Sequence, residues 1–328
     1  MKKAIIFTGL ILLIALAGWI LFNRNASTKE IEQAGNSIAQ TWLPPDINAL
    51  PSGDSATLIK YGRELIANTA FYLGPKGSLA AMSNGLNCQN CHLDAGTRLN
   101  SNCLAAVAST YPKFRNRSGK IESIEFRINE CMERSLNGKA LDSSSDEMKA
   151  MKAYMLWLGK DYRPKKEESI AGTGRLDFLP GPADTVAGRK TFQSRCTSCH
   201  GLNGLGHLNT DSTSYTYPPL WGPNSYNISA GMFTLSKLAG FIKYNMPFSA
   251  TPLQPQLSDE EAWNLAAFIN SQQRPQKTFP YDWPDISKKP VDFPMGPYAD
   301  SFSATQHKYG PFGAIAQAKQ QKAAKQKQ

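Results

Sequence analysis

Two copies of a Cys-x-x-Cys-His motif, "CQNCH" and "CTSCH", are the residues with the clearest chemistry in this sequence. The pattern is typical of covalent c-type haem attachment. Two thiols at this spacing can add to the two vinyl groups of a porphyrin edge, and the following histidine is carried beneath the iron. A zinc knuckle or a redox Cys-x-x-Cys pair is disfavoured, because a histidine directly follows both pairs. We therefore expect two covalently bound haem c groups, attached through Cys88, Cys91, Cys196 and Cys199, with His92 and His200 as iron ligands.

Each iron also needs a ligand on the side opposite its histidine. For the second haem we expect Met246, which precedes a proline in a loop ahead of a helix, with Lys243 as a weaker alternative. A thioether opposite an imidazole raises the reduction potential and suits electron transfer. A backbone carbonyl of Pro218 or Pro219 is expected to orient His200 through its other ring nitrogen.

Cys131 lies outside both motifs, on a helix that we expect over residues 121–136. Arg127 and Ser135 stand four residues before and after it, so one face would present a guanidinium, a sulfur and a hydroxyl. The buried stripe beside them is expected to comprise Ile121, Ile124, Ile128 and Met132. Cys131 suits either an iron ligand or a disulfide to Cys103, which an oxidising compartment permits.

A basic segment, "YPKFRNRSGK", precedes this helix. Arginine binds oxyanions by paired hydrogen bonds, so such a cluster would suit a small dianion. The alternative is a solvated basic face, which we favour for Arg115, for Arg134 and for the lysines Lys113 and Lys120.

The elements around the two motifs repeat in one order: a helix with a Gly-Arg pair, the motif, loops and a closing helix. The closing helices open with expected capping boxes, Ser144 with Glu147 and Ser258 with Glu261. The predicted fold class is all-α, with two tandem cytochrome c domains, long loops and a C-terminal wrapping extension. The expected segments are an export signal or membrane anchor (1–26), the N-terminal cytochrome c domain (27–165), a linker (166–183), the C-terminal cytochrome c domain (184–275), an irregular wrapping extension (276–314) and a basic disordered tail (315–328).

The N-terminus indicates a periplasmic location. Two lysines are followed by the uncharged stretch 4–22, which can either span a membrane or be cleaved near residues 15–17. In both cases the chain from Ser27 onward is exported, and membrane contact is expected only through this segment. The formal charge of +10 leaves an anionic substrate or an acidic protein partner open, and no nucleic-acid partner is expected outside the cytoplasm.

Several segments resemble the di-haem thiosulfate dehydrogenases, the TsdA family, some of which act as tetrathionate reductases. They include "NCQNCHLDAGT", "FRNRSGKIESIEFRINECMERSLNG", "YPPLWGPNSYNISAGM" and "GPYADSFSATQHKYGPF". By this resemblance, Cys131 would be the thiolate ligand of the first, catalytic haem opposite His92, and Met246 a ligand of the second haem. Arg117, Arg127 and Ser135 would match the family's active-site positions. Some members carry a lysine before the methionine and exchange the two as ligands, whereas this chain has Asn245.

The implied reaction joins two thiosulfate ions into tetrathionate with release of two electrons, or runs in reverse. The electrons would pass through the second haem to a periplasmic carrier such as a small cytochrome. Cys131 could serve as a sulfur acceptor in a covalent S-thiosulfonate, a hypothesis implied by the family's chemistry. Two rival functions are a di-haem electron carrier with a Cys103–Cys131 disulfide and a cytochrome that conjugates thiosulfate to a carrier protein.

Overall fold

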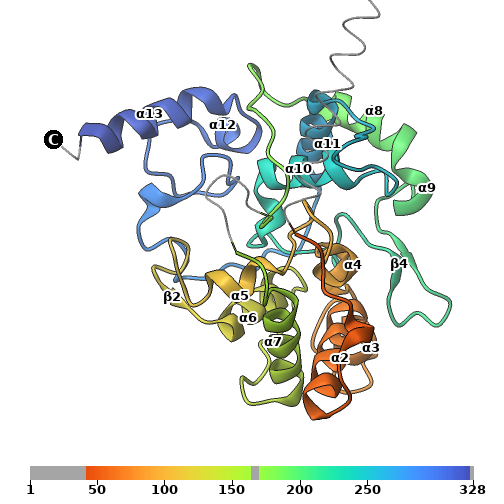
Figure 1. Ribbon diagram of the computed structural model, residues 1–328. Coiled ribbons are helices and arrows are strands. Elements are labelled where there is room, and N and C mark those ends of the chain that lie inside the picture. The colour runs from red at the N-terminus through yellow and green to blue at the C-terminus, as the bar shows by residue number, and fades with distance from the viewer. Residues whose placement is uncertain (1–41, 164–169, 326–328) are drawn as a thin grey trace, which may run out of the picture. The chain divides into compact units, whose positions relative to one another are not determined.

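The computed structural model describes residues 42–163 and 170–325, so the expected export signal lies outside the described residues. In these two ranges no helix is both long enough and apolar enough to cross a membrane. The described chain is mainly helical, and its strands form only two-stranded antiparallel sheets (Figure 1). The predicted all-α class is confirmed.

The first helical group is built around α2 (Asp54–Ala67) and α7 (Asp146–Leu158), which pack against each other (Figure 1). The glycine of the first Gly-Arg pair, Gly62, lies at their crossing, where a Cβ would collide with the carbonyl of Ala150. The remaining elements of this group are α3 (Thr69–Leu73), η2 (Cys88–Asn90), α4 (Leu93–Gly96), α5 (Ala106–Thr110), β1 (Lys113–Arg115), β2 (Lys120–Glu122) and α6 (Ile124–Arg134). A short helix, η1 (Ile47–Ala49), precedes them.

The second helical group repeats this packing. Here α8 (Thr185–Arg195) crosses α11 (Asp259–Ser271), and a Cβ on Gly188, the glycine of the second Gly-Arg pair, would collide with the carbonyl of Asn264. The repeated glycine therefore permits close approach of two helices in both groups. The other elements are α9 (Thr197–His200), β3 (His207–Leu208), β4 (Tyr215–Tyr217), η3 (Gly231–Phe233) and α10 (Leu235–Asn245).

Two helix starts differ from the prediction. Helix α6 begins after Ser123, whose hydroxyl accepts a hydrogen bond from the amide of Phe126. Ile121 belongs instead to β2, opposite Phe114, and is 69% exposed, so its place in the buried stripe was wrong. The N-cap of α7 is Ser145 and not Ser144, whereas the capping box of Ser258 and Glu261 is confirmed.

The C-terminal extension crosses both helical groups. The amide of Trp283 donates to the carbonyl of Arg117 in the first group, and the carboxylate of Asp292 accepts from the amide of Ser236 in the second. His307 holds the extension together, since its ring bonds to the Val291 carbonyl (2.8 Å). The regular elements beyond residue 276 are η4 (Ile286–Lys288), α12 (Ala304–Tyr309) and α13 (Phe312–Lys325).

The expected disordered tail was wrong, because α13 is helical to Lys325. Its sequence is rich in alanine, glutamine and lysine, which are strong helix formers. Phe312 and Ile315 are buried, and the Phe312 ring contacts those of Trp263 and Phe178. The first turn of this helix thus packs on the second helical group.

Candidate functional site

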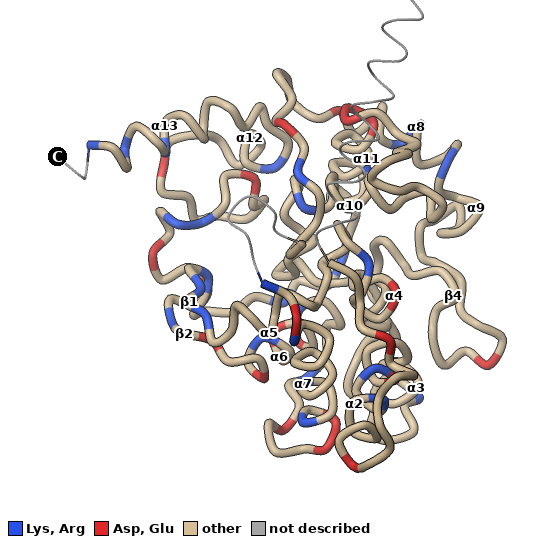
Figure 2. The backbone as a smooth tube through the Cα atoms, viewed as in Figure 1, with Lys and Arg blue, Asp and Glu red and all other residues tan. Residues whose placement is uncertain are grey.

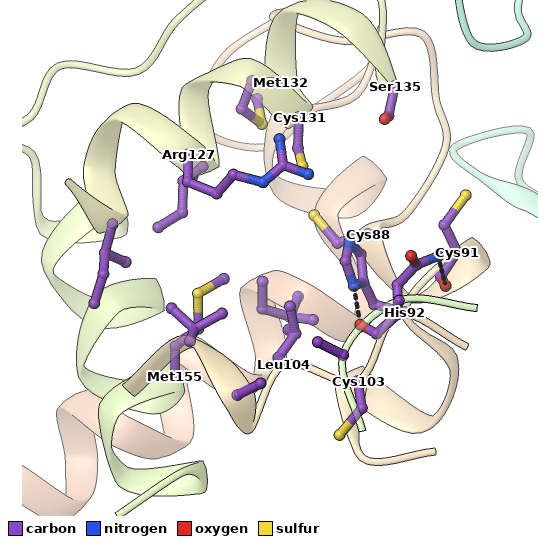
Figure 3. A pocket seen from close by; sticks show the side chains of 18 of the residues that line it. Cys88, Cys91, His92, Cys103, Leu104, Arg127, Cys131, Met132, Ser135 and Met155 are labelled. Atoms are coloured by element: carbon purple, nitrogen blue, oxygen red, sulfur yellow. Dashed lines mark hydrogen bonds between the residues drawn. The ribbon is translucent and has the colours of Figure 1, made fainter. Parts of the chain in front are cut away.

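A cavity of about 220 Å³ lies between the first Cys-x-x-Cys-His motif and α6 (Figure 3). Cys88, Cys91 and His92 line one side, and Arg127, Cys131 and Ser135 line the other. Apolar side chains close the walls, among them Ile66, Leu86, Leu104, Ile128, Met132 and Met155. The structure therefore brings together the predicted residues around Cys131, with the single exception of Arg117.

The His92 ring is oriented by a hydrogen bond from Nδ1 to the backbone carbonyl of Asn102, at 2.6 Å. Because a carbonyl only accepts, Nδ1 carries the proton and the lone pair of Nε2 is available. His200 is held in the same way by the carbonyl of Pro218, at 2.8 Å, which confirms one of the two prolines expected for this role. Both histidines are thus in the tautomer that an iron ligand requires.

Cys131 differs from the two motif cysteines in its acidity. Burial raises the pKa of Cys131, but the charge of Arg127 and the hydrogen bond and charge of His92 more than offset burial and hold the pKa at about 7. Burial raises the pKa of Cys88 and of Cys91 to about 12. Cys131 is therefore the thiol of this cavity that ionises near neutral pH, and the thiolate is the form that binds metals and attacks sulfur.

The alternative disulfide is absent, because Cys103 and Cys131 are both free thiols. Cys103 is buried, and its sulfur faces the carbonyl of Thr97 at 3.9 Å, away from Cys131 (Figure 3). Of the two alternatives for Cys131, the Cys103–Cys131 bridge is therefore not formed, which leaves Cys131 available to the cavity.

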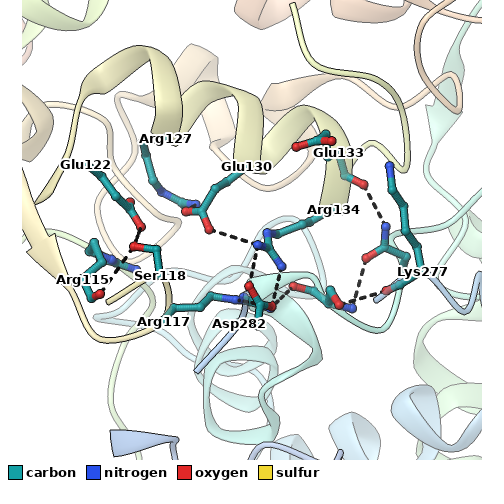
Figure 4. A network of polar contacts seen from close by, with 12 residues as sticks. Arg115, Arg117, Ser118, Glu122, Arg127, Glu130, Glu133, Arg134, Lys277 and Asp282 are labelled. Carbon is teal, nitrogen blue, oxygen red and sulfur yellow. Dashed lines mark hydrogen bonds and ion pairs between the residues drawn. The ribbon is translucent and has the colours of Figure 1, made fainter. Parts of the chain in front are cut away.

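Arg117 does not line this cavity, although the family resemblance implied an active-site position for it near Cys131. Its guanidinium bonds to the carboxylate of Asp282 (2.9 Å) and to the carbonyl of Ser229 (2.6 Å). The same carboxylate accepts from Arg134, at 2.7 and 2.8 Å (Figure 4). Arg134 is only 2% exposed, so its expected place on a solvated face was wrong. A single aspartate of the extension binds both arginines.

Three further basic residues line the cavity: Lys113, Arg115 and Lys237. Arg115, expected on a solvated face, is half-buried there, and Lys237 reaches the same cavity from α10. Lys237 keeps an exposed side, yet desolvation and the charges of Arg127 and Arg115 lower its pKa to about 8. No pattern in the sequence near Lys237 predicted that this residue lines the cavity, because its place there depends on how α10 lies relative to the first group.

At the second motif, Met246 follows α10 directly, and both Met246 and Cys196 are partly buried and pack against the same apolar core. Lys243 is engaged elsewhere: its ammonium binds the Leu257 carbonyl (2.7 Å) and the Asp259 carboxylate (2.6 Å). This disfavours Lys243 as an alternative iron ligand.

Asn245, the position where some relatives carry a lysine, is buried. Its amide donates to the carbonyl of Asn100, at 2.9 Å, and to the carbonyl of Phe241, at 3.1 Å. The asparagine therefore links α10 to the first group and places an uncharged side chain directly before Met246.

The donor set of both motifs fits a haem better than a bare metal ion. In the described residues no group of three His, Cys, Asp or Glu side chains is arranged to hold a metal. The first cavity has paired thiols and an oriented imidazole at one side and apolar walls around them. These are the features of a c-type haem pocket.

Comparisons with known proteins agree with this arrangement. The family model "SoxA/TsdA, cytochrome c domain" matches residues 79–161, and the model "Cytochrome c" matches residues 185–273. The thiosulfate dehydrogenase of Thiomonas intermedia (strain K12) is 37% identical over 238 residues, which are 72% of this chain and 72% of that protein. The chain belongs to the thiosulfate dehydrogenase family.

Other relatives support this membership. The thiosulfate dehydrogenase of Allochromatium vinosum is 37% identical over 235 residues, 70% of this chain and 83% of that protein. The solved thiosulfate dehydrogenase (TsdBA) of Marichromatium purpuratum, "as isolated" form, superimposes with a TM-score of 0.67 at 29% identity. The match covers 81% of this chain but only 56% of that longer chain. The predicted family and the two cytochrome c domains are confirmed.

Proposed function

We propose that this protein is a di-haem cytochrome that joins two thiosulfate ions into tetrathionate and releases two electrons, or catalyses the reverse reaction. The supporting observation is the free, acidic thiol of Cys131, which faces His92 across the cavity beside Arg127. Relatives that are 37% identical carry the name thiosulfate dehydrogenase.

Two haem c groups would be held covalently. Cys88 and Cys91 would attach the first, with His92 and Cys131 as iron ligands. The attachment residues and iron ligands of the second would be Cys196, Cys199, His200 and Met246. When bound, the haems supply one-electron relays for the two electrons of the reaction.

The polar and basic residues of the cavity offset the electrostatic repulsion between the two thiosulfate dianions. Two dianions about 5 Å apart repel each other by about 3 kcal/mol even in water, and more where water is excluded. Nη1 of Arg127 donates to the Glu130 carboxylate at 3.0 Å, and the remaining N–H groups of the guanidinium can donate to an oxyanion. Ser135 offers a hydroxyl on the same helix face. Their role is to hold one thiosulfate with its outer sulfur toward Cys131.

Cys131 would act as the sulfur acceptor. Its thiolate forms an S–S bond with the outer sulfur of one thiosulfate, and the two electrons lost in this step leave for an electron carrier. The outer sulfur of a second thiosulfate then attacks the sulfur bound to Cys131. This forms the central bond of tetrathionate, while the Cys131–sulfur bond breaks and the thiolate is restored.

The carrier is proposed to be a small periplasmic cytochrome that meets the second domain. A periplasmic location rests on the export signal expected in residues 1–26. We also propose the domain limits 27–165 and 184–275, with the linker 166–183 between them.

The proposal is tested with the purified holoenzyme and an artificial electron acceptor. We expect thiosulfate-dependent reduction of the acceptor, formation of tetrathionate, and loss of both in Cys131→Gly. Paramagnetic spectra of the oxidised proteins should differ between wild type and the variant, because the variant loses a sulfur ligand. An unchanged ligand signature in Cys131→Gly would refute the assignment of Cys131, and absence of turnover in the wild type would refute the reaction. Mass spectrometry of Cys131 after substrate exposure tests the covalent adduct.

A further inference from the structure

A second cavity, of about 280 Å³, lies beside the haem cavity. Lys113, Arg115 and Lys237 line both cavities, so the two adjoin along this basic wall. Two of these residues, Lys113 and Arg115, belong to strand β1 of the β1–β2 hairpin, where Figure 2 shows Lys and Arg positions. A single water needs only roughly 15 Å³ on the same measure, so the second cavity can hold a small hydrated ion.

All the charged side chains that line the second cavity are basic. Five basic side chains line it, and none of its lining residues is an aspartate or glutamate. The five are Lys113, Arg115, Arg117, Lys237 and Lys288. In the described chain only Arg117 among them forms an ion pair, with Asp282.

The nearby carboxylates form no ion pair with the other four in the described residues, although Glu122 attracts Arg115 and Asp292 attracts Lys237 at longer range. Asp282 is shared between Arg117 and Arg134, and Asp292 accepts the amide of Ser236 at the start of α10. Asp285 accepts the amide of Ser287 at 3.0 Å and only adds a longer-range attraction to Lys288. A cluster of like charges without partners is unfavourable unless an anion occupies it.

Besides desolvation, the lowered pKa of Lys237 reflects repulsion among these basic side chains. After desolvation, the largest causes that lower its pKa are the charges of Arg127, Arg115 and Arg117. Arg127 belongs to the haem cavity and Arg117 to the second cavity, so Lys237 senses both. An anion on either side of Lys237 would relieve this repulsion.

We propose that the second cavity is an anion subsite that holds the second thiosulfate dianion beside the haem cavity before it meets Cys131. This inference rests on the proposed function, which consumes two dianions in one turnover. Arg127 and Ser135 hold the first thiosulfate. The second thiosulfate moves from the second cavity to the haem cavity along Lys113, Arg115 and Lys237, which line both. In the reverse reaction the same subsite would receive one of the two thiosulfate ions formed.

Two variants test the subsite in the oxidised holoenzyme. Arg115→Gln and Lys288→Gln each remove one charge from the second cavity, and Lys288 does not line the haem cavity. Lys120→Gln is the matched control, because Lys120 lies opposite Arg115 in the hairpin but lines neither cavity. Calorimetric titration with sulfate, a redox-inert dianion, measures anion binding without turnover.

We expect each cavity variant to weaken sulfate binding about threefold to fivefold, the scale of one partly exposed charge pair, and the control to leave it unchanged. KM for thiosulfate should rise by the same factor with little change in kcat, since Cys131 and Arg127 are intact. Wild-type sulfate affinity in both variants would overturn the subsite. Loss of the reaction in the wild type would instead refute the proposed function, and the sulfate titration would still decide the subsite.

Discussion

Replacing the shared carboxylate, Asp282→Asn, is the sharpest test of how the extension stabilises the site. Asp282 accepts two bonds from Arg117, at 2.9 and 3.0 Å, and two from Arg134, at 2.7 and 2.8 Å. The side chains of the two arginines are 11% and 3% exposed, so solvent screens these pairs weakly. Glu130 is the only other carboxylate paired with Arg134 in the described residues, at 3.3 Å.

The expected loss follows from this burial. Removal of one partner from a buried ion pair leaves an uncompensated charge and costs about 3–5 kcal/mol. We therefore expect Asp282→Asn to lower the free energy of unfolding of the holoprotein by about 3–5 kcal/mol in urea denaturation. The amide keeps a similar shape, so lost packing contributes little.

Asp161→Asn is the matched control, because Asp161 faces Lys160 at 3.9 Å with a side chain that is 79% exposed. Such surface pairs contribute at most about 1 kcal/mol, and we expect a change within about 0.5 kcal/mol. A loss below about 1 kcal/mol in Asp282→Asn would refute the reasoning, since the network would then be solvated.

Three further predictions concern the scaffold. Gly188→Ala should lower the free energy of unfolding by about 1–3 kcal/mol, because the added methyl group overpacks the contact between α8 and α11. Gly313→Ala should raise the free energy of unfolding by about 0.5–1 kcal/mol, because the space around Gly313 in α13 is open. Urea denaturation measures both changes. Ile315→Ala should lower it by about 2–4 kcal/mol, because Ile315 is buried; an unchanged value would mean that α13 is undocked. The hydrogen bond from Lys152 holds the pKa of Glu125 at about 2. The ion pair therefore stabilises the fold at pH values above the pKa of Glu125 in the unfolded chain, and this contribution is lost as the pH falls toward 2. The difference in the free energy of unfolding between wild type and Glu125→Gln should vanish near pH 2.

Local patterns in the sequence were sufficient for several features of the site. The Cys-x-x-Cys-His motifs, the row of Arg127, Cys131 and Ser135, and the capping box at Ser258 each involve residues that are close together along the chain. A carbonyl partner for His200 was also predicted, because the proline segment follows the motif closely. Such features depend on spacing along the chain, which a sequence displays directly.

Ile121 and the C-terminal helix were mispredicted because more than one local structure suited their residues. The apolar spacing of Ile121 matched that of α6, but Ile121 pairs with Phe114 in the β1–β2 hairpin and so belongs to β2. The alanine- and lysine-rich tail suited either disorder or a helix, and the burial of Phe312 and Ile315 decided for the helix. Propensity is a weak prior where tertiary packing decides.

The sequence alone determined the haem-binding motifs, the helical class, the family and the thiol at the centre of the proposed site. Only the tertiary structure decided that Cys103 stays apart from Cys131, that Asp282 binds Arg117 and Arg134, and that Lys237 joins the basic wall. Asp282 lies 148 positions from Arg134 along the chain. Partnerships of this kind arise from packing between distant segments, and no local spacing encodes them.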